Sequence, residues 1–178
     1  LESSEAARAG MTGLLRGLVA EMPDLRFVTQ QSEGAIRPDM WGYDDHSVPR
    51  VYVESKFWAG LTDNQPVSYL RQLATYGPST VLLMIVPDAR KETVWRELGH
   101  RLQDAGIPVG DGEIACGAVA HAVATDLGPT LALATWSSVL SNLSDHLGDD
   151  PAAKSDLSQL RALCDTADTD AFVPMSPE

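Results

Sequence analysis

The chain has 178 residues and a formal net charge of −12, with 44% hydrophobic and 21% charged residues, which is ordinary for a soluble globular protein. No apolar run approaches the roughly 20 residues needed to cross a bilayer, and no basic segment followed by an apolar one marks a signal peptide. The acidic balance argues against a broad basic surface that coats nucleic acid, but it is compatible with a local groove that uses bound metal ions.

At this length the simplest expectation is one domain over residues 1–178. Cys116 and Cys164 stand far apart without a Cys-x-x-Cys pattern, so neither a disulfide framework nor a zinc site is indicated. This cysteine usage predicts a cytoplasmic location. The chain begins with Leu-Glu rather than Met, which is compatible with a fragment of a longer protein.

Helical spacing of apolar side chains predicts an amphipathic helix at the start of the chain, and alternation then predicts three consecutive strands. A second helix is expected after a polar segment that contains Pro66, and the fully apolar run after it is typical of a central strand covered on both faces. These elements are expected at residues 4–21 (helix, N-cap Ser3 or Ser4), 25–30, 35–43 and 50–58 (strands), about 62–76 (helix) and 80–86 (strand).

The second half of the chain is predicted to continue with mixed elements. They are a helix at 90–105, an irregular stretch at 107–126 that allows strand or loop, a strand at 130–136, helices at 137–147 and 154–166, and a tail at 168–178 that packs through Phe172 and Val173. The whole order predicts an α/β sandwich with a mixed central sheet flanked by helices. Its core is expected at about 4–105, with a C-terminal αβ extension at 106–178.

The strand at 50–58 carries two opposite charges on one face. Alternation places Glu54 and Lys56 on the same side, between Tyr52 and Trp58. If Tyr43 pairs with Arg50 across the turn at 44–49, Asp39 of the preceding strand lies directly opposite Glu54. Two like charges facing each other across a ladder are unfavourable unless a cation lies between them. A one-residue shift in register would separate the two carboxylates.

Asp39, Glu54 and Lys56 together predict metal-dependent hydrolysis of phosphodiester bonds. Two carboxylates on adjacent strands, with the backbone carbonyl of Ser55, suit Mg²⁺, which takes few protein ligands and keeps several waters. Such an ion neutralises phosphate oxygens and activates a water. Lys56 is placed to orient that water or to stabilise the charge that develops on the phosphate.

These residues, in the form Pro38-Asp39 and Glu54-Ser55-Lys56, resemble the motif of the PD-(D/E)xK, or restriction-endonuclease-like, nuclease superfamily. The family core is α-β-β-β-α-β, the order that the patterns predict for the first half of the chain. The resemblance implies that Asp39 and Glu54 bind Mg²⁺, for which Mn²⁺ can substitute, and that Lys56 is catalytic. It implies a DNA substrate and a role in defence, restriction or repair, and it makes a homodimer plausible because one such site cuts one strand.

The predicted second helix contains Gln-x-x-x-Tyr twice, as Gln65–Tyr69 and Gln72–Tyr76, with all four residues at helical spacing. This resembles a motif in the branch of the superfamily that includes RecB-type and exonuclease-like enzymes. The resemblance implies that the glutamine and tyrosine line the active site and contact the DNA backbone, the first copy being preferred. The alternative is an amphipathic helix whose tyrosines are half-buried core residues.

The superfamily often adds an acidic residue from the first helix to the metal site. Glu5 and Glu21 are the candidates here, with Glu33 as a third from the following loop, and each is otherwise a solvated surface charge. Arg37 could hold a phosphate or pair with a neighbouring carboxylate.

Two alternatives to a nuclease follow from the same residues. One is an exposed hairpin with a cross-strand ion pair, and the other is a non-catalytic restriction-like fold that serves as a binding or sensor module of a larger defence protein.

The sequence lacks the motifs of other catalytic chemistries. The four histidines have no metal-ligand spacing, and neither a Gly-x-Ser-x-Gly elbow nor a phosphate-binding glycine loop is present.

Overall fold

The computed structural model describes residues 1, 4–34 and 36–170, without the side chains of residues 167–170. Its helices are α1 (Glu5–Leu18), α2 (Val67–Ala74), the short η1 (Asp88–Arg90), α3 (Lys91–Asp104), α4 (Trp136–His146) and α5 (Pro151–Asp170). Its strands are β1 (Arg26–Thr29), β2 (Met40–Tyr43), β3 (Pro49–Ser55), β4 (Val81–Val86), β5 (His121–Ala124) and β6 (Thr130–Thr135). The predicted order α-β-β-β-α-β is therefore confirmed for the first half of the chain.

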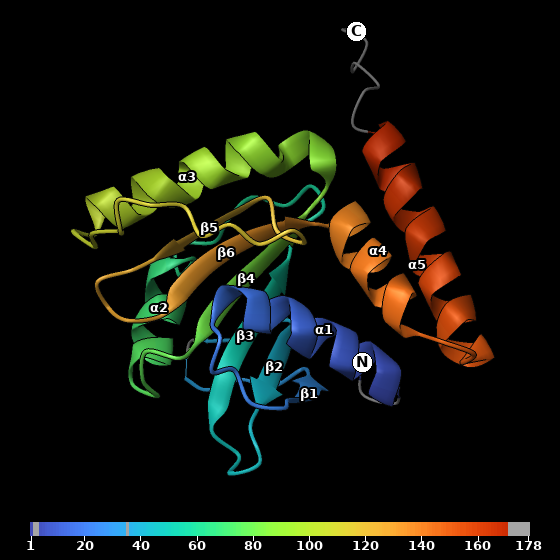
Figure 1. The fold of residues 1–178 in the computed structure, drawn as a ribbon. Coiled ribbons are helices and arrows are strands. Elements are labelled where there is room, and N and C mark those ends of the chain that lie inside the picture. The colour runs from blue at the N-terminus through green and yellow to red at the C-terminus, as the bar shows by residue number, and fades with distance from the viewer. Residues whose placement is uncertain (2–3, 35, 171–178) are drawn as a thin grey trace, which may run out of the picture.

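The strands form one six-stranded sheet in the order β1-β2-β3-β4-β6-β5. The first three strands are an antiparallel meander, β3, β4 and β6 are parallel, and β5 is antiparallel to β6. Helices α1 and α4 cover one face of the sheet and α2 and α3 the other, while α5 lies against α4 (Figure 1). The predicted α/β fold with a mixed sheet between helices is confirmed.

Two hydrophobic clusters hold the layers together, one on each face of the sheet. Alternation along β3 divides its side chains between them: Val51 and Val53 face α1 and α4, and Tyr52 faces α2 and α3. Strand β4 is buried at every residue, as its unbroken apolar sequence predicts for a central strand. Glu54 therefore belongs to the α2 side of the sheet, at the carboxyl end of β3.

Several element ends differ from the predicted ones. Helix α1 begins after Ser4, which caps it as expected by accepting a hydrogen bond from the Ala7 N–H at 3.3 Å, but it ends at Leu18 because Val19 adopts an extended backbone. Helix α5 begins at Pro151 rather than 154. The Asp150 carboxylate accepts from the Ala153 N–H at 3.0 Å, so the expected break is the capped start of the helix.

The strands around the candidate site are shorter than predicted. Strand β2 begins at Met40 rather than 35, since Pro38 has no N–H to give to a ladder, and β3 ends at Ser55 rather than 58. Lys56 still donates its N–H to the Ile85 carbonyl at 2.8 Å, so it continues the line of β3 by one residue. Helix α2 begins at Val67, which leaves Gln65 in the loop before it and not on the helix.

The remaining differences lie in the second half of the chain. The irregular stretch at 107–126 forms a loop followed by β5, and an isolated bridge joins Val109 to Thr125. The predicted contacts of Phe172 and Val173 fall outside the described residues. None of the described helices is both long enough and apolar enough to cross a membrane.

Candidate functional site

The pairing of β2 with β3 brings the two predicted acidic residues to one end of the sheet. Met40 pairs with Val53 and Trp41 with Tyr52, so Asp39, one residue before Met40, comes level with Glu54, one residue after Val53. The ladder shifts between Gly42 and Tyr43, and Tyr43 pairs with Pro49 instead of Arg50. The assumed end pair is therefore wrong, but the register of the rest of the ladder is the predicted one.

Asp39 is exposed and is held against the end of β3 by the residue that follows Glu54. Its Oδ2 atom accepts hydrogen bonds from the Ser55 N–H at 2.8 Å and from the Ser55 hydroxyl at 2.6 Å. The sequence suggested a role for the Ser55 carbonyl and did not suggest one for its hydroxyl, because alternation points this side chain to the opposite face from Glu54. The bond arises because Asp39 lies outside the regular ladder.

Glu54 is a buried carboxylate with one oxygen paired and one left over. Its Oε1 lies 2.8 Å from Lys56 Nζ, and the side chains of Glu54 and Lys56 are only 5% and 13% exposed. Its Oε2 is buried and has no hydrogen-bond partner among the described residues. Buried carboxylate oxygens are normally satisfied, so this atom marks a place where a donor or a cation would be stabilised.

Tyr69 of α2 is a buried residue whose hydroxyl is affected by the charges of both carboxylates. Burial raises the pKa of its hydroxyl, the charge of Glu54 raises it further, hydrogen bonds with the Gln65 side chain and the Arg37 backbone lower it, and the charge of Asp39 raises it again. Of the two carboxylates, Glu54 has the larger effect on this pKa. Tyr69 is therefore the residue of α2 whose hydroxyl is most affected by the charge at the end of β3.

The first Gln-x-x-x-Tyr pair is buried. Gln65 is 2% exposed and Tyr69 is 4% exposed, and Gln65 Oε1 accepts from the Thr62 N–H at 3.2 Å. Arg101 of α3 fixes the same loop by donating to the Gln65 carbonyl at 2.8 Å. This pair lies below the site as a support and does not form its surface.

The second pair forms a separate hydrogen-bonded chain. Gln72 Nε2 donates to the Tyr76 hydroxyl at 3.0 Å, and that hydroxyl donates to Glu33 Oε2 at 2.7 Å. Burial and the neighbouring Glu33 raise the pKa of Tyr76. The chain ties α2 to the loop before β2, which is a role in packing the helix.

The additional acidic candidates do not gather at Glu54. Glu5 is exposed in the first turn of α1, and Glu33 is engaged by Tyr76. Glu21 lines a small cavity with Asp44 and Arg50, toward the turn that joins β2 to β3 and away from the Glu54 end of these strands. Within the described residues, no group of three or more His, Cys, Asp or Glu side chains is placed to hold a metal ion.

Arg37 is exposed, and the contact that it makes at the site comes from its backbone, which hydrogen-bonds Tyr69. The structure pairs Glu54 with Lys56 and holds Asp39 against Ser55, so that the three charged residues lie at the same end of β3, with Asp39 on the Ser55 side of the strand. Two hard carboxylates and one ammonium at the end of a central strand can bind a divalent cation or a phosphate through a few contacts.

Comparisons with known proteins leave the family open. No family model matches the chain, and no curated protein matches it. The YaeQ protein from Xanthomonas axonopodis pv. citri is a solved structure that is similar over 74% of this chain and 79% of its own, with 16% sequence identity and a TM-score of 0.28. A score this low carries no argument about fold or function, so the function rests on the site itself.

Proposed function

We propose that the protein is a metal-dependent nuclease that hydrolyses phosphodiester bonds in DNA, with the PD-(D/E)xK arrangement that its motif resembles. The observation that carries the proposal is the unpartnered Oε2 of Glu54, a buried oxygen beside Lys56. A carboxylate kept half-satisfied in this way is unusual in a structural ion pair and is suited to a ligand that arrives from solvent.

The residues present fit a magnesium ion held by few protein atoms. Asp39 and Glu54 would hold it, with the Ser55 carbonyl as a third ligand, and Mn²⁺ would substitute for it. Ser55 donates to only one oxygen of Asp39, which leaves the other free for a ligand. When bound, the ion supplies positive charge for the phosphate oxygens and lowers the pKa of a coordinated water.

Lys56 has a catalytic position in this proposal. An ammonium has three donors, and one of them is directed at Glu54, so two remain for a water or a phosphate oxygen. Its side chain is largely buried, which strengthens its field at a bound phosphate. The burial of Gln65 and Tyr69 favours a role in positioning Glu54 over direct contact with DNA.

A second candidate is a binding or sensor module that keeps the fold without catalysis. The closed ion pair between Lys56 and Glu54 favours it, since the lysine itself already supplies a cation to the buried carboxylate. The net charge of −12 also opposes a polyanionic partner unless a local site overcomes the repulsion.

Cleavage of linear, circular and single-stranded DNA in Mg²⁺ or Mn²⁺ tests the nuclease. EDTA should abolish cleavage. Asp39→Ala or Lys56→Ala should reduce the rate of cleavage by about 100-fold or more, because each substitution removes a group that stabilises charge in the transition state, through the metal ion or directly. Asp45→Ala and Lys154→Ala change exposed residues of the same types elsewhere and should leave the rate unchanged. Undiminished cleavage by the Lys56→Ala protein would rule out the mechanism.

Metal binding separates the two candidates without any substrate. A bound ion stabilises the folded state, by about 2.7 kcal/mol at a concentration 100 times its Kd, so Mg²⁺ or Mn²⁺ should raise the melting temperature. Glu54→Gln should remove this rise. A melting temperature that does not respond to either metal would favour the binding module.

A further inference from the structure

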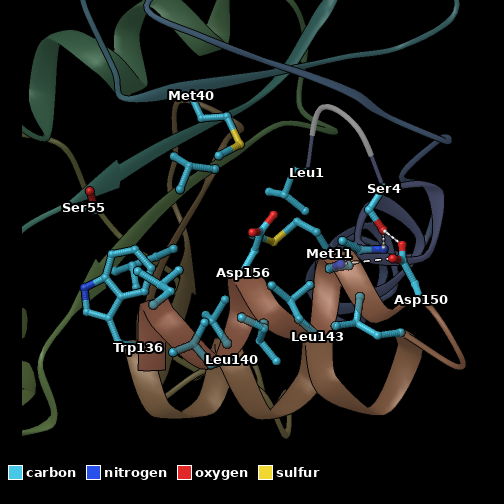
Figure 2. A pocket seen from close by; sticks show the side chains of 18 of the residues that line it. Leu1, Ser4, Met11, Met40, Ser55, Trp136, Leu140, Leu143, Asp150 and Asp156 are labelled. Carbon is cyan, nitrogen blue, oxygen red and sulfur yellow. Dashed lines mark hydrogen bonds between the residues drawn. The ribbon is translucent and has the colours of Figure 1, made fainter. Parts of the chain in front are cut away.

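A cavity of about 470 Å³ lies beside the candidate site, on the opposite face of the sheet from Glu54. It extends from Asp39 and Ser55 to the space enclosed by α1, α4 and α5 (Figure 2). Ligand pockets have volumes of roughly 300–1,000 Å³, so this cavity is large enough for a small molecule. The proposed nuclease mechanism uses Asp39 and Ser55 at one end of this lining and none of its apolar part.

The walls of the cavity are mostly apolar side chains from six different elements. Among them are Met11 of α1, Val53 of β3, Ile85 of β4 and Leu140, Leu143 and Leu157 of the two C-terminal helices. A space with such walls retains water poorly and favours an apolar occupant. Burial of one methylene group changes affinity by about fourfold, so a chain of several methylenes would bind measurably.

The charged side chains that line the cavity, as far as the structure describes it, are all aspartates. Asp39 accepts from Ser55, and Asp150 accepts from the Ser4 hydroxyl at 3.2 Å and from a backbone N–H of α5. Asp156 makes no ion pair with another described residue, and Figure 2 shows its carboxylate rising from α5 toward Leu1 and Met11. The lining contains no Lys, Arg or His side chain in the described residues.

We propose that this cavity binds a small amphiphile with an apolar chain and a positively charged head group. The chain fills the apolar space between α1 and α4, and the head group pairs with Asp156 at the surface of α5. An anionic amphiphile of the same length would meet three carboxylates and no cationic side chain, so the cavity selects by charge as well as by shape. The proposal is independent of the nuclease, because binding needs neither metal nor DNA.

Titration calorimetry with decylammonium chloride at pH 7, below its micelle concentration, tests the proposal on the full chain. One saturable site is expected. Hexylammonium should bind about 200-fold more weakly, since four fewer methylenes are buried. Decanoate should bind at least about tenfold more weakly than decylammonium, because its charge is repelled.

Two pairs of variants locate the site. Leu157→Trp should fill the cavity and weaken decylammonium binding at least about tenfold, whereas Leu163→Trp, an exposed position on the same helix, should leave it unchanged. Asp156→Asn should weaken binding about fivefold, whereas Asp145→Asn, on α4 and outside the cavity, should not. If Leu157→Trp does not fold, the comparison of Asp156→Asn with Asp145→Asn tests the location of the site.

Several results would overturn the proposal. They are the absence of saturable binding, equal affinity for decylammonium and decanoate, and equal weakening by the cavity variants and their controls. An equal loss in Leu157→Trp and Leu163→Trp would mean that the amphiphile coats α5 from outside. Decylammonium should bind equally well in the presence of EDTA. The result of this experiment is therefore independent of the result of the nuclease test.

Discussion

Three carboxylates near the β2–β3 hairpin differ in how completely they are bonded. Asp44 is buried, with Oδ1 accepting from the His46 and Val48 N–H groups and Oδ2 2.8 Å from Arg50 Nε. Asp39 is exposed and Glu54 is buried, and each has one oxygen engaged. Complete bonding makes Asp44 a structural residue of the turn, whereas the incomplete bonding of Glu54 makes it the candidate for a ligand.

Asp44 gives a prediction about acid stability. Burial by itself would raise the pKa of Asp44, but the Val48 N–H, Arg50 and the His46 N–H outweigh it and lower the pKa below its ordinary value. A lowered pKa in the folded state contributes stability above the unfolded pKa of about 3.9, and this contribution is lost as the pH falls through the folded pKa. Asp44→Asn should therefore lower the free energy of unfolding by about 2 kcal/mol at pH 7, because hydrogen bonds to a charged group are lost.

Urea unfolding at a series of pH values measures this effect. The difference in stability between the wild-type protein and Asp44→Asn should be constant near neutral pH and should narrow below about pH 4. Asp45→Asn, in the same turn but exposed, serves as the control and should show little difference at any pH. If the difference in unfolding free energy between the two proteins stays constant until acid unfolds them, the charge of Asp44 does not stabilise the fold.

Helix α1 shows how an element is adjusted to its neighbours. It contains three glycines, although glycine disfavours a helix interior. At Gly17 an added Cβ would lie 2.7 Å from the Cys116 Sγ atom, whereas at Gly13 it would come no closer than 3.9 Å to His146. A side chain at position 17 would therefore force Cys116 to move, whereas one at position 13 would not disturb its neighbours.

Replacement of the two glycines by alanine should have opposite effects. Gly13→Ala should stabilise the protein by up to about 1 kcal/mol through helix propensity. Gly17→Ala should destabilise it, since the new methyl group displaces Cys116. In a double-mutant cycle followed by thermal unfolding, Cys116→Ala should convert Gly17→Ala into a neutral or stabilising change. Independent, additive effects of these two changes would contradict the close contact.

At the scale of the whole molecule, the second half of the chain completes the sheet that carries the site. Strand β6 pairs with β4 along its whole length, on the side opposite β3, and α4 packs beside α1 on one face. Strand β4 is therefore central only when residues after 105 are present. The site at the end of β3 depends on β4 through the bond from the Lys56 N–H to the Ile85 carbonyl.

Two shortened chains test this dependence. Residues 1–105 should show no cooperative thermal transition, because the apolar edge of β4 would be exposed to water. Residues 1–148 retain β6 and α4 and lack α5 and the residues after it, so this chain should unfold cooperatively at a lower temperature than the whole protein. Circular dichroism during heating distinguishes the outcomes, and a cooperative transition in the shorter chain would show that the first half folds without β6.

The sequence by itself determined the features that depend on neighbouring residues. Periodicity gave the order of the elements in the first half of the chain and the buried β4, and alternation placed Glu54 and Lys56 on one face, where their charged atoms are 2.8 Å apart. The register that brings Asp39 level with Glu54 also followed from local pattern, even though the pair assumed at the turn was wrong.

Only the tertiary structure decided the features that depend on segments distant in the chain. These are the place of β6 beside β4, the burial of Gln65 in the loop before α2, and the cavity between α1, α4 and α5. Local periodicity predicts that a side chain is buried, but it does not predict which element that side chain packs against. The unpartnered Oε2 of Glu54 belongs to this second group, because it is defined by what the surrounding layers leave unbonded.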